Sequence, residues 1–481
     1  MPERLTLFLD RTRELRDLLF DEGVEFPCGG LSNCGGCAVR VVEGEVPADE
    51  EMRSVFSDAE LAAGWRLGCR AAASGRVVLE IGQWQGAILT DESPLQFEPA
   101  EGLGVAIDLG TTTLVVQAVD LASGDVRAVR SALNPQAAYG ADVMTRIGLD
   151  RPAELCRVIR SKLGEMVRDA LCGGTAREIL LAGNTVMHHL FCGVDVEPLT
   201  HAPFESPNLE ERRFTAGELG WDVSGNPAAA FLPAIGGFVG SDVLCGMVAI
   251  GMLEEREPCA LMDLGTNGEI VVGNRQGAVC ASTAAGPAFE AGRIAMGMRA
   301  VRGAIDHVRV HGSALDCHVI GGGEARGVCG SGLVDAVAAG LDTGAIRPNG
   351  RLSNGARFPL LGDVSLSQRD IRELQLAKGA IGTGFDMLAA GRPVSRVYLA
   401  GAFGNYVDAR SALRIGLVRG DPRQLTAAGN TSLRGARLLL LNPSRREEQI
   451  AGVIRRTRHV ALAQDPEFMD RFGESLSFPA G

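Results

Sequence analysis

The stretch F-P-C-G-G-L-S-N-C-G-G-C-A-V-R at residues 26–40 places three cysteines on one glycine-rich loop. Cys28, Cys34 and Cys37 are spaced C-x5-C-x2-C, and Cys69 follows further along the chain in R-L-G-C-R. A plant-type [2Fe–2S] cluster takes four thiolates, three from such a loop and one from a distant turn. Glycines beside the cysteines let the backbone approach the cluster closely. The four cysteines are therefore the predicted cluster ligands.

Zinc and disulfide bonds explain this spacing less well. A zinc ribbon needs two short cysteine pairs, and Cys69 has no other cysteine near it in sequence. Disulfide frameworks belong to small secreted chains. The first gap of the loop has five residues where the plant-type loop has four, which favours a β-grasp ferredoxin of another type. The remaining eight of the 12 cysteines are scattered, and we expect them to be buried thiols.

Size and charge exclude several classes of protein. A chain of 481 residues exceeds what one hydrophobic core normally serves, so two or three domains are expected. The net charge of −12 is unsuited to nucleic acid, whose binding depends on neutralising phosphates. No apolar run approaches the ~20 residues that span a bilayer, and the N-terminus lacks the apolar core of a signal peptide. We expect a cytoplasmic protein that binds neither a membrane nor nucleic acid.

Residues 1–82 read as a β-grasp [2Fe–2S] ferredoxin domain. An alternating strand is predicted near residues 5–9, a helix over 12–24, a hairpin that turns at Gly44, and a closing strand over 75–81. About 80 residues is marginal for a core on its own, so the cluster is expected to add to the stability of this domain.

The rest of the chain divides into a linker and a duplicated body. Residues 83–101 hold two prolines and show no sustained period, which is typical of a linker. After the linker, G-V-A-I-D-L-G-T-T-T-L at 104–114 is echoed by C-A-L-M-D-L-G-T-N-G-E-I at 259–270. Each copy is an apolar strand, a tight acidic–glycine turn and a second strand. A second echo pairs E-I-L-L-A-G-N-T-V at 178–186 with R-V-Y-L-A-G-A-F-G-N at 396–405.

Two related halves, each with a hairpin whose turn faces a common cleft, are the plan of the actin-like (ASKHA, ribonuclease H-like) ATPase fold. We assign residues 102–255 to its first subdomain and 256–481 to its second. The predicted fold class is thus multidomain, α/β and α+β, with a β-grasp ferredoxin domain ahead of this body. The chain contains neither a P-loop nor a Rossmann glycine motif.

The turns of the body have the chemistry of an ATP site. Glycine backbone amides and threonine hydroxyls can surround phosphate oxygens, and aspartates can hold Mg²⁺ through its water shell. Asp108, Asp263 and Glu269 are the candidate catalytic residues, and either Asp263 or Glu269 could position the attacking water. The glycine turn near residue 330 is a candidate hinge or phosphate contact. The candidate nucleotide-binding residues are Gly110, Thr111, Thr112, Thr113, Gly265, Thr266, Asn267, Gly330, Ser331, Gly332, Gly401, Ala402, Phe403 and Gly404.

Several motifs together resemble a known family. They are the cysteine loop, I-D-L-G-T-T-T (107–113), N-P-Q-A-A-Y-G-A-D-V-M-T-R-I (134–147), L-A-G-N-T-V-M-H-H-L (181–190), D-L-G-T-N-G-E (263–269) and G-V-C-G-S-G-L (327–333). In this combination the chain resembles the reductive activators of corrinoid-dependent enzymes, which join a [2Fe–2S] ferredoxin domain to an actin-like ATPase domain.

The resemblance implies an ATP-hydrolysing enzyme that reduces an inactive Co(II) corrinoid protein to Co(I), with the electron passing through the cluster. The implied cofactors are a [2Fe–2S] cluster, ATP and Mg²⁺. The implied partners are a corrinoid protein or corrinoid-dependent methyltransferase and an electron donor that the sequence does not identify, and a homodimer stays open. Longer relatives have a middle segment between the two parts, where this chain has only about 20 linker residues.

Three other functions are compatible with parts of the pattern. A ferredoxin-linked small-molecule kinase of the ASKHA superfamily would need an acceptor pocket. A nucleotide-gated redox-sensing adaptor would bind its partner without delivering electrons. An activator of radical dehydratases would carry a [4Fe–4S] cluster at a dimer interface, and the four-cysteine head argues against that class.

Overall fold

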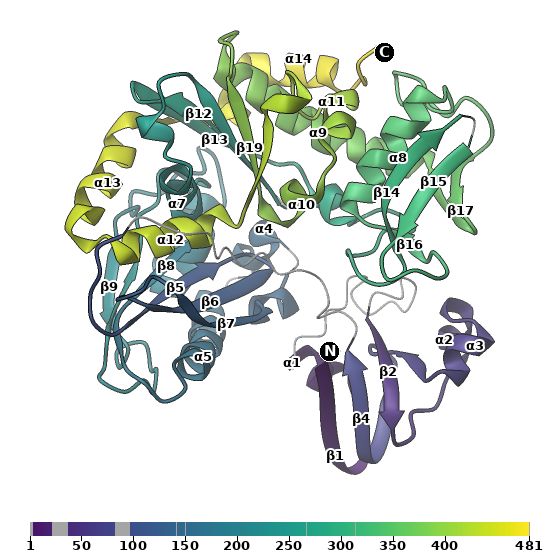
Figure 1. Cartoon of the computed structure of the whole chain (residues 1–481), viewed down its shortest axis with the longest axis horizontal. Helices are drawn as coiled ribbons and strands as arrows, with labels where there is room; N and C mark the ends of the chain where they lie inside the picture. The colour runs from purple at the N-terminus through teal and green to yellow at the C-terminus, as the bar shows by residue number, and fades with distance from the viewer. Residues whose placement is uncertain are drawn as a thin grey trace.

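The computed structural model describes residues 3–21, 37–81, 97–140, 142–149, 151–265, 267–312 and 314–480. Within these ranges the chain forms a four-stranded N-terminal domain and a larger body built on two six-stranded sheets (Figure 1). The predicted site residues Cys28, Cys34 and Thr266 lie outside the described residues, as does most of the linker 83–101, and the Ala402 side chain is likewise not described. Among the helices of the described ranges, we find none with both the length and the apolar character needed to cross a membrane.

The N-terminal domain is an antiparallel sheet with strand order β1-β4-β2-β3 and three short helices. The strands are β1 (Glu3–Glu14), β2 (Ala38–Glu43), β3 (Trp65–Leu67) and β4 (Ala72–Ile81), and the helices are α1 (Arg16–Asp21), α2 (Glu50–Val55) and α3 (Asp58–Ala62). Its core is formed by alternating apolar residues of these elements, among them Val39, Met52 and Leu79, which are fully buried.

Two details of this domain differ from the sequence-based predictions. The helix predicted over 12–24 begins only at Arg16, because Glu14 still pairs with Ala72 of β4 and this strand pairing overrides the local helical pattern. The hairpin predicted around Gly44 is also wrong. Gly44 turns the chain at φ +88°, but the partners of β2 are β3 and β4 and not the residues that follow the turn.

The body repeats one sheet plan twice, which confirms the predicted duplication. In the first sheet the order is β7-β6-β5-β8-β10-β9, and in the second it is β20-β19-β11-β12-β13-β21. Each has an antiparallel meander of three strands and then a strand parallel to the first of them. The strands are β5 (Leu103–Leu109), β6 (Thr113–Asp120), β7 (Val126–Leu133), β8 (Ala176–Gly183), β9 (Arg212–Thr215), β10 (Ala228–Phe231), β11 (Cys259–Leu264), β12 (Gly268–Asn274), β13 (Gly277–Thr283), β19 (Arg396–Ala400), β20 (Leu425–Gly429) and β21 (Thr457–His459).

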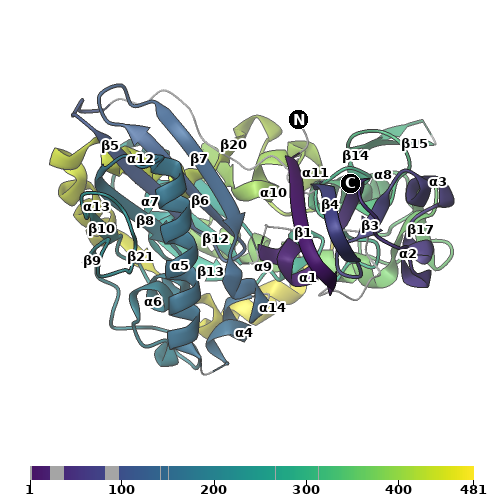
Figure 2. The ribbon, with the colours of Figure 1, turned by 90° about the horizontal axis from the view of Figure 1, so that it is seen from below.

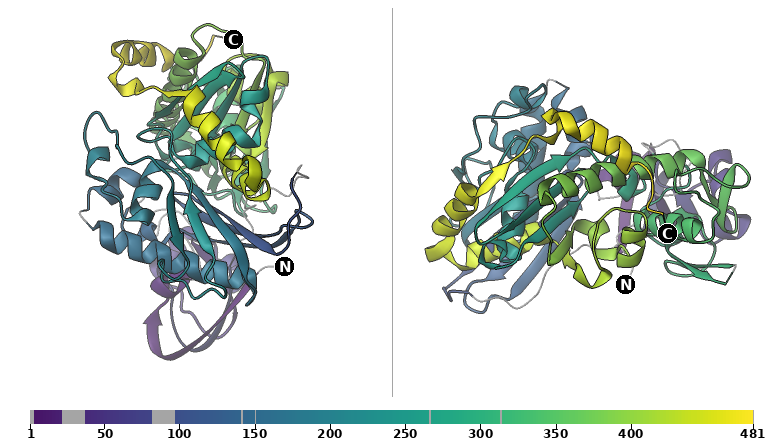
Figure 3. Two further views of the ribbon diagram at one scale, coloured as in Figure 1. Left: turned by 90° about the vertical axis from the view of Figure 1, so that its left-hand side faces the viewer. Right: turned by 90° about the horizontal axis from the view of Figure 1, so that it is seen from above.

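Helices cover both faces of each sheet, as the continuous apolar strands require. In the first half (residues 102–255) α5 (Pro152–Leu171) and α6 (Thr185–Cys192) cover the outer face. Between the two sheets lie α7 (Ser241–Ala249) and α12 (Thr431–Leu441), whose apolar residues form one core with residues of both sheets (Figures 1 and 3). The chain therefore returns late to the first half, and α13 (Pro443–Arg456) follows α12 there.

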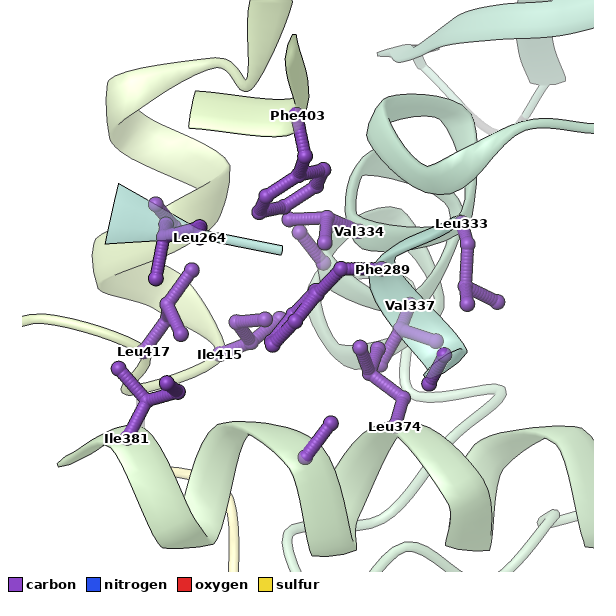
Figure 4. Packing of buried hydrophobic residues seen from close by; sticks show 14 of the residues in the cluster. Leu264, Phe289, Leu333, Val334, Val337, Leu374, Ile381, Phe403, Ile415 and Leu417 are labelled. Carbon is purple, nitrogen blue, oxygen red and sulfur yellow. The ribbon is translucent and has the colours of Figure 1, made fainter. Parts of the chain in front are cut away.

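The second half (residues 256–481) carries an additional layer at the side near the N-terminal domain (Figures 1 and 2). The remaining strands and α-helices of the second half are β14 (Ala304–His311), β15 (Ala314–Val319), β16 (Gly327–Val328), α8 (Gly330–Asp342), β17 (Arg357–Leu361), β18 (Val364–Ser367), α9 (Gln368–Ala389), α10 (Gly401–Tyr406), α11 (Ala409–Arg414) and α14 (Pro466–Ser475), of which β14, β15, β16 and α8 lie in this layer. A large apolar core joins these elements to the second sheet, and in it Phe289 stacks on Phe403 with ring centroids 4.6 Å apart (Figure 4).

The last described residues of the predicted linker are attached to the body. The Glu98 amide donates a hydrogen bond to the Leu441 carbonyl at 3.0 Å, and the Ala100 amide donates to the Leu121 carbonyl at 2.9 Å. Phe97 packs against the core between the two sheets. Backbone pairing of this kind fixes the point at which the body begins.

Candidate functional site

Both predicted phosphate turns are closed by the backbone amide of their glycine, and the second turn is one residue shorter than the first. The Gly110 amide donates to the Thr113 carbonyl at 3.1 Å, and the Gly265 amide donates to the Asn267 carbonyl at 3.0 Å. A Cβ on Gly110 would lie 2.6 Å from the Thr113 carbonyl oxygen, so this position accepts only glycine. Both turns follow a strand that ends just beyond a candidate aspartate, which places Asp108 and Asp263 at equivalent positions of the two sheets.

Two asparagine side chains hold the first phosphate turn, residues 110–113, through hydrogen bonds. Asn184, which caps α6, donates from Nδ2 to the Thr111 hydroxyl at 2.9 Å. Asn134, from the N-P-Q segment, donates from Nδ2 to the Gly110 carbonyl at 2.9 Å, and its amide donates to the Thr112 carbonyl at 2.8 Å. These contacts give the N-P-Q segment a structural task, which is to hold the turn in one conformation.

The Asp108 carboxylate accepts hydrogen bonds from residues near the C-terminal end of the chain. Asn430 donates from Nδ2 to one carboxylate oxygen of Asp108 at 2.8 Å, and Ser432 donates from its hydroxyl to the other oxygen at 2.8 Å. Burial raises the pKa of Asp108, and these two hydrogen bonds oppose that rise. The sequence analysis missed Asn430 and Ser432, because they belong to the first turn of a helix with no motif of its own.

Four carboxyl groups influence one another between the two halves. Burial, then the charge of Asp263 and then that of Asp108, raise the pKa of Asp242 to about 8. Burial and then Asp108 raise the pKa of Asp263 to about 6. The pKa of Glu269 is raised by burial and by Asp242 and Asp263, although the Ser282 hydroxyl, which donates to it at 3.1 Å, opposes this rise. Like charges gathered in this way favour the binding of a cation.

Asp242 is a member of this group that the sequence analysis missed. It lies in the first turn of α7, after the glycine-containing segment G-F-V-G-S. A Cβ on Gly240 would overlap the Gly183 carbonyl and the Asn184 backbone, and the Ser241 hydroxyl lies 3.1 Å from both the amide and the carbonyl oxygen of Gly183. The start of α7 is thus attached to the end of β8. A glycine followed closely by an acidic residue at a helix start was the available signal.

The four carboxyl groups do not form a direct metal cage. Among the described residues, no three histidine, cysteine, aspartate or glutamate side chains converge closely enough to coordinate one metal ion. This spacing fits Mg²⁺, which keeps several of its own waters and is contacted through them. The candidate residues for such water-mediated contacts are Asp108, Asp242, Asp263 and Glu269.

The glycine turn at residue 401 lies directly beside Asp263. Gly401 has φ +80°, and a Cβ there would approach the Asp263 carboxylate oxygen Oδ1 to 2.7 Å. Gly404 packs on the backbone of Leu399, and Phe403 is buried against Phe289 (Figure 4). Gly401 is therefore placed at the carboxyl group, whereas Phe403 and Gly404 pack into the core beneath it.

The turn at residues 330–332 supports α8. A Cβ on Gly330 would overlap the Phe289 carbonyl, and one on Gly332 would overlap the Ile305 carbonyl. The Ser331 hydroxyl donates to the Asp306 carbonyl at 3.0 Å. All three residues are buried, and Ser331 and Gly332 fasten α8 to β14, while the role of this turn in nucleotide binding stays a prediction.

The described part of the cluster loop brings two predicted ligands near each other. The Gly68 amide, one residue before Cys69, donates to the Cys37 carbonyl at 2.9 Å. Cys37 is fully buried, and both cysteines contact the core of the N-terminal domain. Two cysteines whose backbones are brought together in this way fit two of the four ligand positions of a [2Fe–2S] cluster, and Cys28 and Cys34 lie outside the described residues.

A cavity of about 700 Å³ lies elsewhere in the second half. Its lining comes from α9, Arg419 after α11, α14 and the residues after α14, and it contains none of the predicted site residues. Charged side chains such as Arg419, Glu467 and Arg471 dominate its wall. We therefore build the candidate site from the two hairpins and α7 and not from this cavity.

Known proteins match this chain along nearly its whole length. A family model for a 2Fe-2S iron-sulfur cluster binding domain matches residues 6–74, one for the RACo middle region matches 103–255, and one for the C-terminal ASKHA domain of RACo matches 257–481. The corrinoid activation enzyme RamQ of Eubacterium limosum is 33% identical over 421 residues, covering 78% of this chain and 70% of RamQ.

Two further proteins agree with these matches. The [Co(II) methylated amine-specific corrinoid protein] reductase of Methanosarcina barkeri is 27% identical over 417 residues, covering 78% of this chain and 77% of that protein. The solved structure of a reductive activator for corrinoid, iron-sulfur protein superposes with a TM-score of 0.70 at 26% identity, covering 97% of this chain and 95% of that one.

Fold and site thus define a ferredoxin-type iron–sulfur domain joined to an ASKHA body. The chain belongs to the family of reductive activators of corrinoid proteins. One expectation drawn from the resemblance is corrected by the matches. The middle region of the family is present as residues 103–255, which form the first six-stranded sheet and its helices.

Proposed function

We propose that this protein activates a corrinoid protein by reduction, using ATP bound between the two halves of the body to drive the transfer of one electron from its [2Fe–2S] cluster to the cobalt, which is thereby reduced from Co(II) to Co(I). The observation that carries the proposal is the union, in one chain, of an iron–sulfur domain and a duplicated fold with four mutually repelling carboxyl groups at its junction. The named activities of the relatives support the choice of a corrinoid protein as substrate.

The following residues would bind the phosphates and the Mg²⁺ ion of the nucleotide. Backbone amides of the turns that begin at Gly110 and Gly265 would contact the phosphates, and the Thr111 hydroxyl is oriented by Asn184, which donates a hydrogen bond to it. Asp108 and Asp242 from the first half and Asp263 and Glu269 from the second would bind Mg²⁺ through water, which lowers their pKa values toward the ionised state.

Asp263 is the stronger candidate to orient the attacking water. In the cation-free site its pKa of about 6 leaves it ionised near neutral pH, whereas the pKa of Glu269 is raised well above its usual value. A group must be ionised to accept a proton from water. Of the two residues that the sequence left open for this role, Asp263 and Glu269, we therefore assign it to Asp263.

The four cysteines Cys28, Cys34, Cys37 and Cys69 would hold the [2Fe–2S] cluster. A bound cluster supplies one-electron chemistry at a potential near −400 mV if it is of the plant type. Co(I) is a stronger reductant than such a cluster, so the transfer needs a second source of free energy. A nucleotide that binds two conformations of the body with different affinity can provide it.

The test uses the cluster-loaded protein, an artificial one-electron donor and a Co(II) corrinoid protein. Formation of Co(I), followed by its absorption spectrum, is expected only when Mg·ATP is present, and inorganic phosphate is expected to be released in step with it. Equal reduction without nucleotide would contradict the role of ATP. Nucleotide hydrolysis that yields a phosphorylated small molecule would point to a kinase instead.

A further inference from the structure

One arginine of the body reaches into the iron–sulfur domain. Arg326 precedes β16, and its guanidinium forms an ion pair with Glu60 of α3. The same guanidinium lies over the rings of Phe56 and Trp65, 5.3 Å and 5.6 Å from their centroids. The Arg326 and Glu60 side chains are only 21% and 20% exposed. A partly desolvated cation over two aromatic faces is a more specific contact than an exposed ion pair.

Both partners of this ion pair are oriented by their own surroundings. Oxygen Oε2 of Glu60 accepts hydrogen bonds from the Ser57 amide and hydroxyl, which leaves Oε1 to meet Arg326. The Arg326 amide donates to the Gly303 carbonyl at 2.9 Å, and a Cβ on Gly303 would lie 3.1 Å from Cδ of Arg326. Preorganised side chains lose little conformational freedom when the domains meet, which favours association.

The contact connects the cluster end of one domain to the site of the other. Trp65 begins β3, which leads directly to Gly68 and Cys69. On the body side, β16 follows Arg326 and leads into α8. Figure 1 shows the iron–sulfur domain next to β16, on the side of the second half.

A packed route leads from α8 toward the carboxyl groups. Gly330, at the start of α8, packs against Phe289, which stacks on Phe403 of α10 (Figure 4). The first residue of α10, Gly401, packs against Asp263. Contiguity alone does not establish coupling, so the coupling itself must be measured.

We infer that Arg326 positions the iron–sulfur domain on the nucleotide-binding half, so that the nucleotide bound in the body sets how firmly that domain is held. The inference rests on the proposed function, because it takes nucleotide binding between the halves as given. A change in the closure of the second half would move β16 and with it Arg326. The positive charge next to β3 also favours the reduced, more negative form of the cluster, and by reciprocity reduction of the cluster favours the docked arrangement.

The experiment uses the full chain with its cluster and compares charge reversals. The variants are Arg326→Glu, Glu60→Arg and the two combined. A fourth variant, Arg326→Gln, removes the positive charge without placing a negative charge opposite Glu60. Arg309→Glu is the matched control, because Arg309 is an exposed arginine of the neighbouring strand β14. Two quantities are measured: the radius of gyration by small-angle X-ray scattering, and the midpoint potential of the cluster by titration followed with EPR.

Each single change at position 326 or 60 is expected to increase the radius of gyration. Arg326→Glu and Arg326→Gln, which remove the positive charge from the cluster end, are also expected to shift the midpoint potential to more negative values. The double reversal should restore both quantities, and Arg309→Glu should alter neither. Single variants that scatter like the wild type, or a double reversal that stays as extended as the single ones, would overturn the docking role. A merely structural arginine would not be rescued by exchanging the two charges.

The role of the nucleotide is tested separately on the wild type. Calorimetry with ADP and with a non-hydrolysable ATP analogue first shows whether the body binds nucleotide. Absence of binding would refute the proposed function and the coupling, while the scattering comparison would still decide the docking contact. Binding with identical scattering in both nucleotide states would overturn the coupling alone. The expected result is a different radius of gyration in the two states, and no such difference in Arg326→Glu.

Discussion

Asn430 donates a 2.8 Å hydrogen bond to the carboxylate of Asp108, a residue 322 positions earlier in the chain. Ser432 donates to the second oxygen of the same carboxylate at 2.8 Å. The first hairpin therefore depends on α12, a helix that follows five of the six strands of the second sheet in the chain. The two halves of the body are joined at the site itself and not only through their shared core.

Ser432→Ala should weaken nucleotide turnover more than stability. It leaves one oxygen of a buried carboxylate without its donor, and a hydrogen bond to a charged group contributes about 1.5–3 kcal/mol. If that amount is lost in the transition state, steady-state phosphate release should fall about 10- to 100-fold. Ser395→Ala is the control, because the Ser395 hydroxyl donates to the Pro258 carbonyl at an exposed position away from the carboxyl groups. Equal turnover in the two variants would refute this role of Ser432.

Asp242→Asn should stabilise the protein at alkaline pH in the absence of Mg²⁺. The pKa of Asp242 is raised on folding to about 8, so the penalty for ionising it in the folded state is absent at low pH. That penalty grows as pH rises from about 4 and is complete above about 8. At ~1.4 kcal/mol per pKa unit this shift sets an upper bound of about 5 kcal/mol on the gain in the free energy of unfolding near pH 8.

The gain should shrink toward pH 4 and again when Mg²⁺ is added, because a bound cation favours the ionised carboxylate of the wild type. Asparagine can still accept the hydrogen bond of 2.8 Å that the Val243 amide donates to Asp242. Denaturant unfolding at several pH values measures the effect, and Asp222→Asn, at an exposed carboxylate, is the control. A gain independent of pH would contradict the electrostatic explanation.

Gly401→Ala should abolish tight nucleotide binding. Gly401 has φ +80°, and the new Cβ would lie 2.7 Å from the Asp263 carboxylate, so that Asp263 must shift. Gly391→Ala is a closely matched control, because Gly391 has φ +74° and no atom within 4 Å of the new Cβ. Both variants carry a similar backbone strain, of about 1 kcal/mol. Isothermal titration with ADP should therefore show a loss of at least tenfold in affinity for the first variant only.

Cys69→Ser should remove most of the cluster while the body stays folded. Serine is a poor substitute for a thiolate ligand of iron, and the described cluster end places Cys69 next to Cys37 through the hydrogen bond between Gly68 and Cys37. Iron analysis and visible absorption are expected to fall, with little change in the unfolding of the body. Cys172→Ser changes an exposed cysteine of the body and should retain the full iron content. A zinc content that replaces iron in the wild type would refute the cluster assignment.

The local patterns of the sequence were sufficient for the sheet plan. The two D-L-G-T turns each lie between apolar strands, and an apolar run that is buried on both faces leaves few alternatives to a central strand. The strand–glycine–helix echo at 178–186 and 396–405 likewise became β8 with α6 and β19 with α10. In the N-terminal domain the same approach gave the wrong helix start, since pairing of Glu14 with Ala72 depends on residues far along the chain.

What the sequence determined by itself is the chemistry available at each turn: four cysteines with cluster spacing, two acidic–glycine turns and the glycine at 401. What only the tertiary structure decided is which groups meet. Asp242, Asn430, Ser432 and Arg326 carry no local motif, and each gained its place through elements that pack together from distant parts of the chain. The physical reason is that hydrogen bonds and charge interactions act over a few ångströms in space, whatever the separation of their partners along the chain.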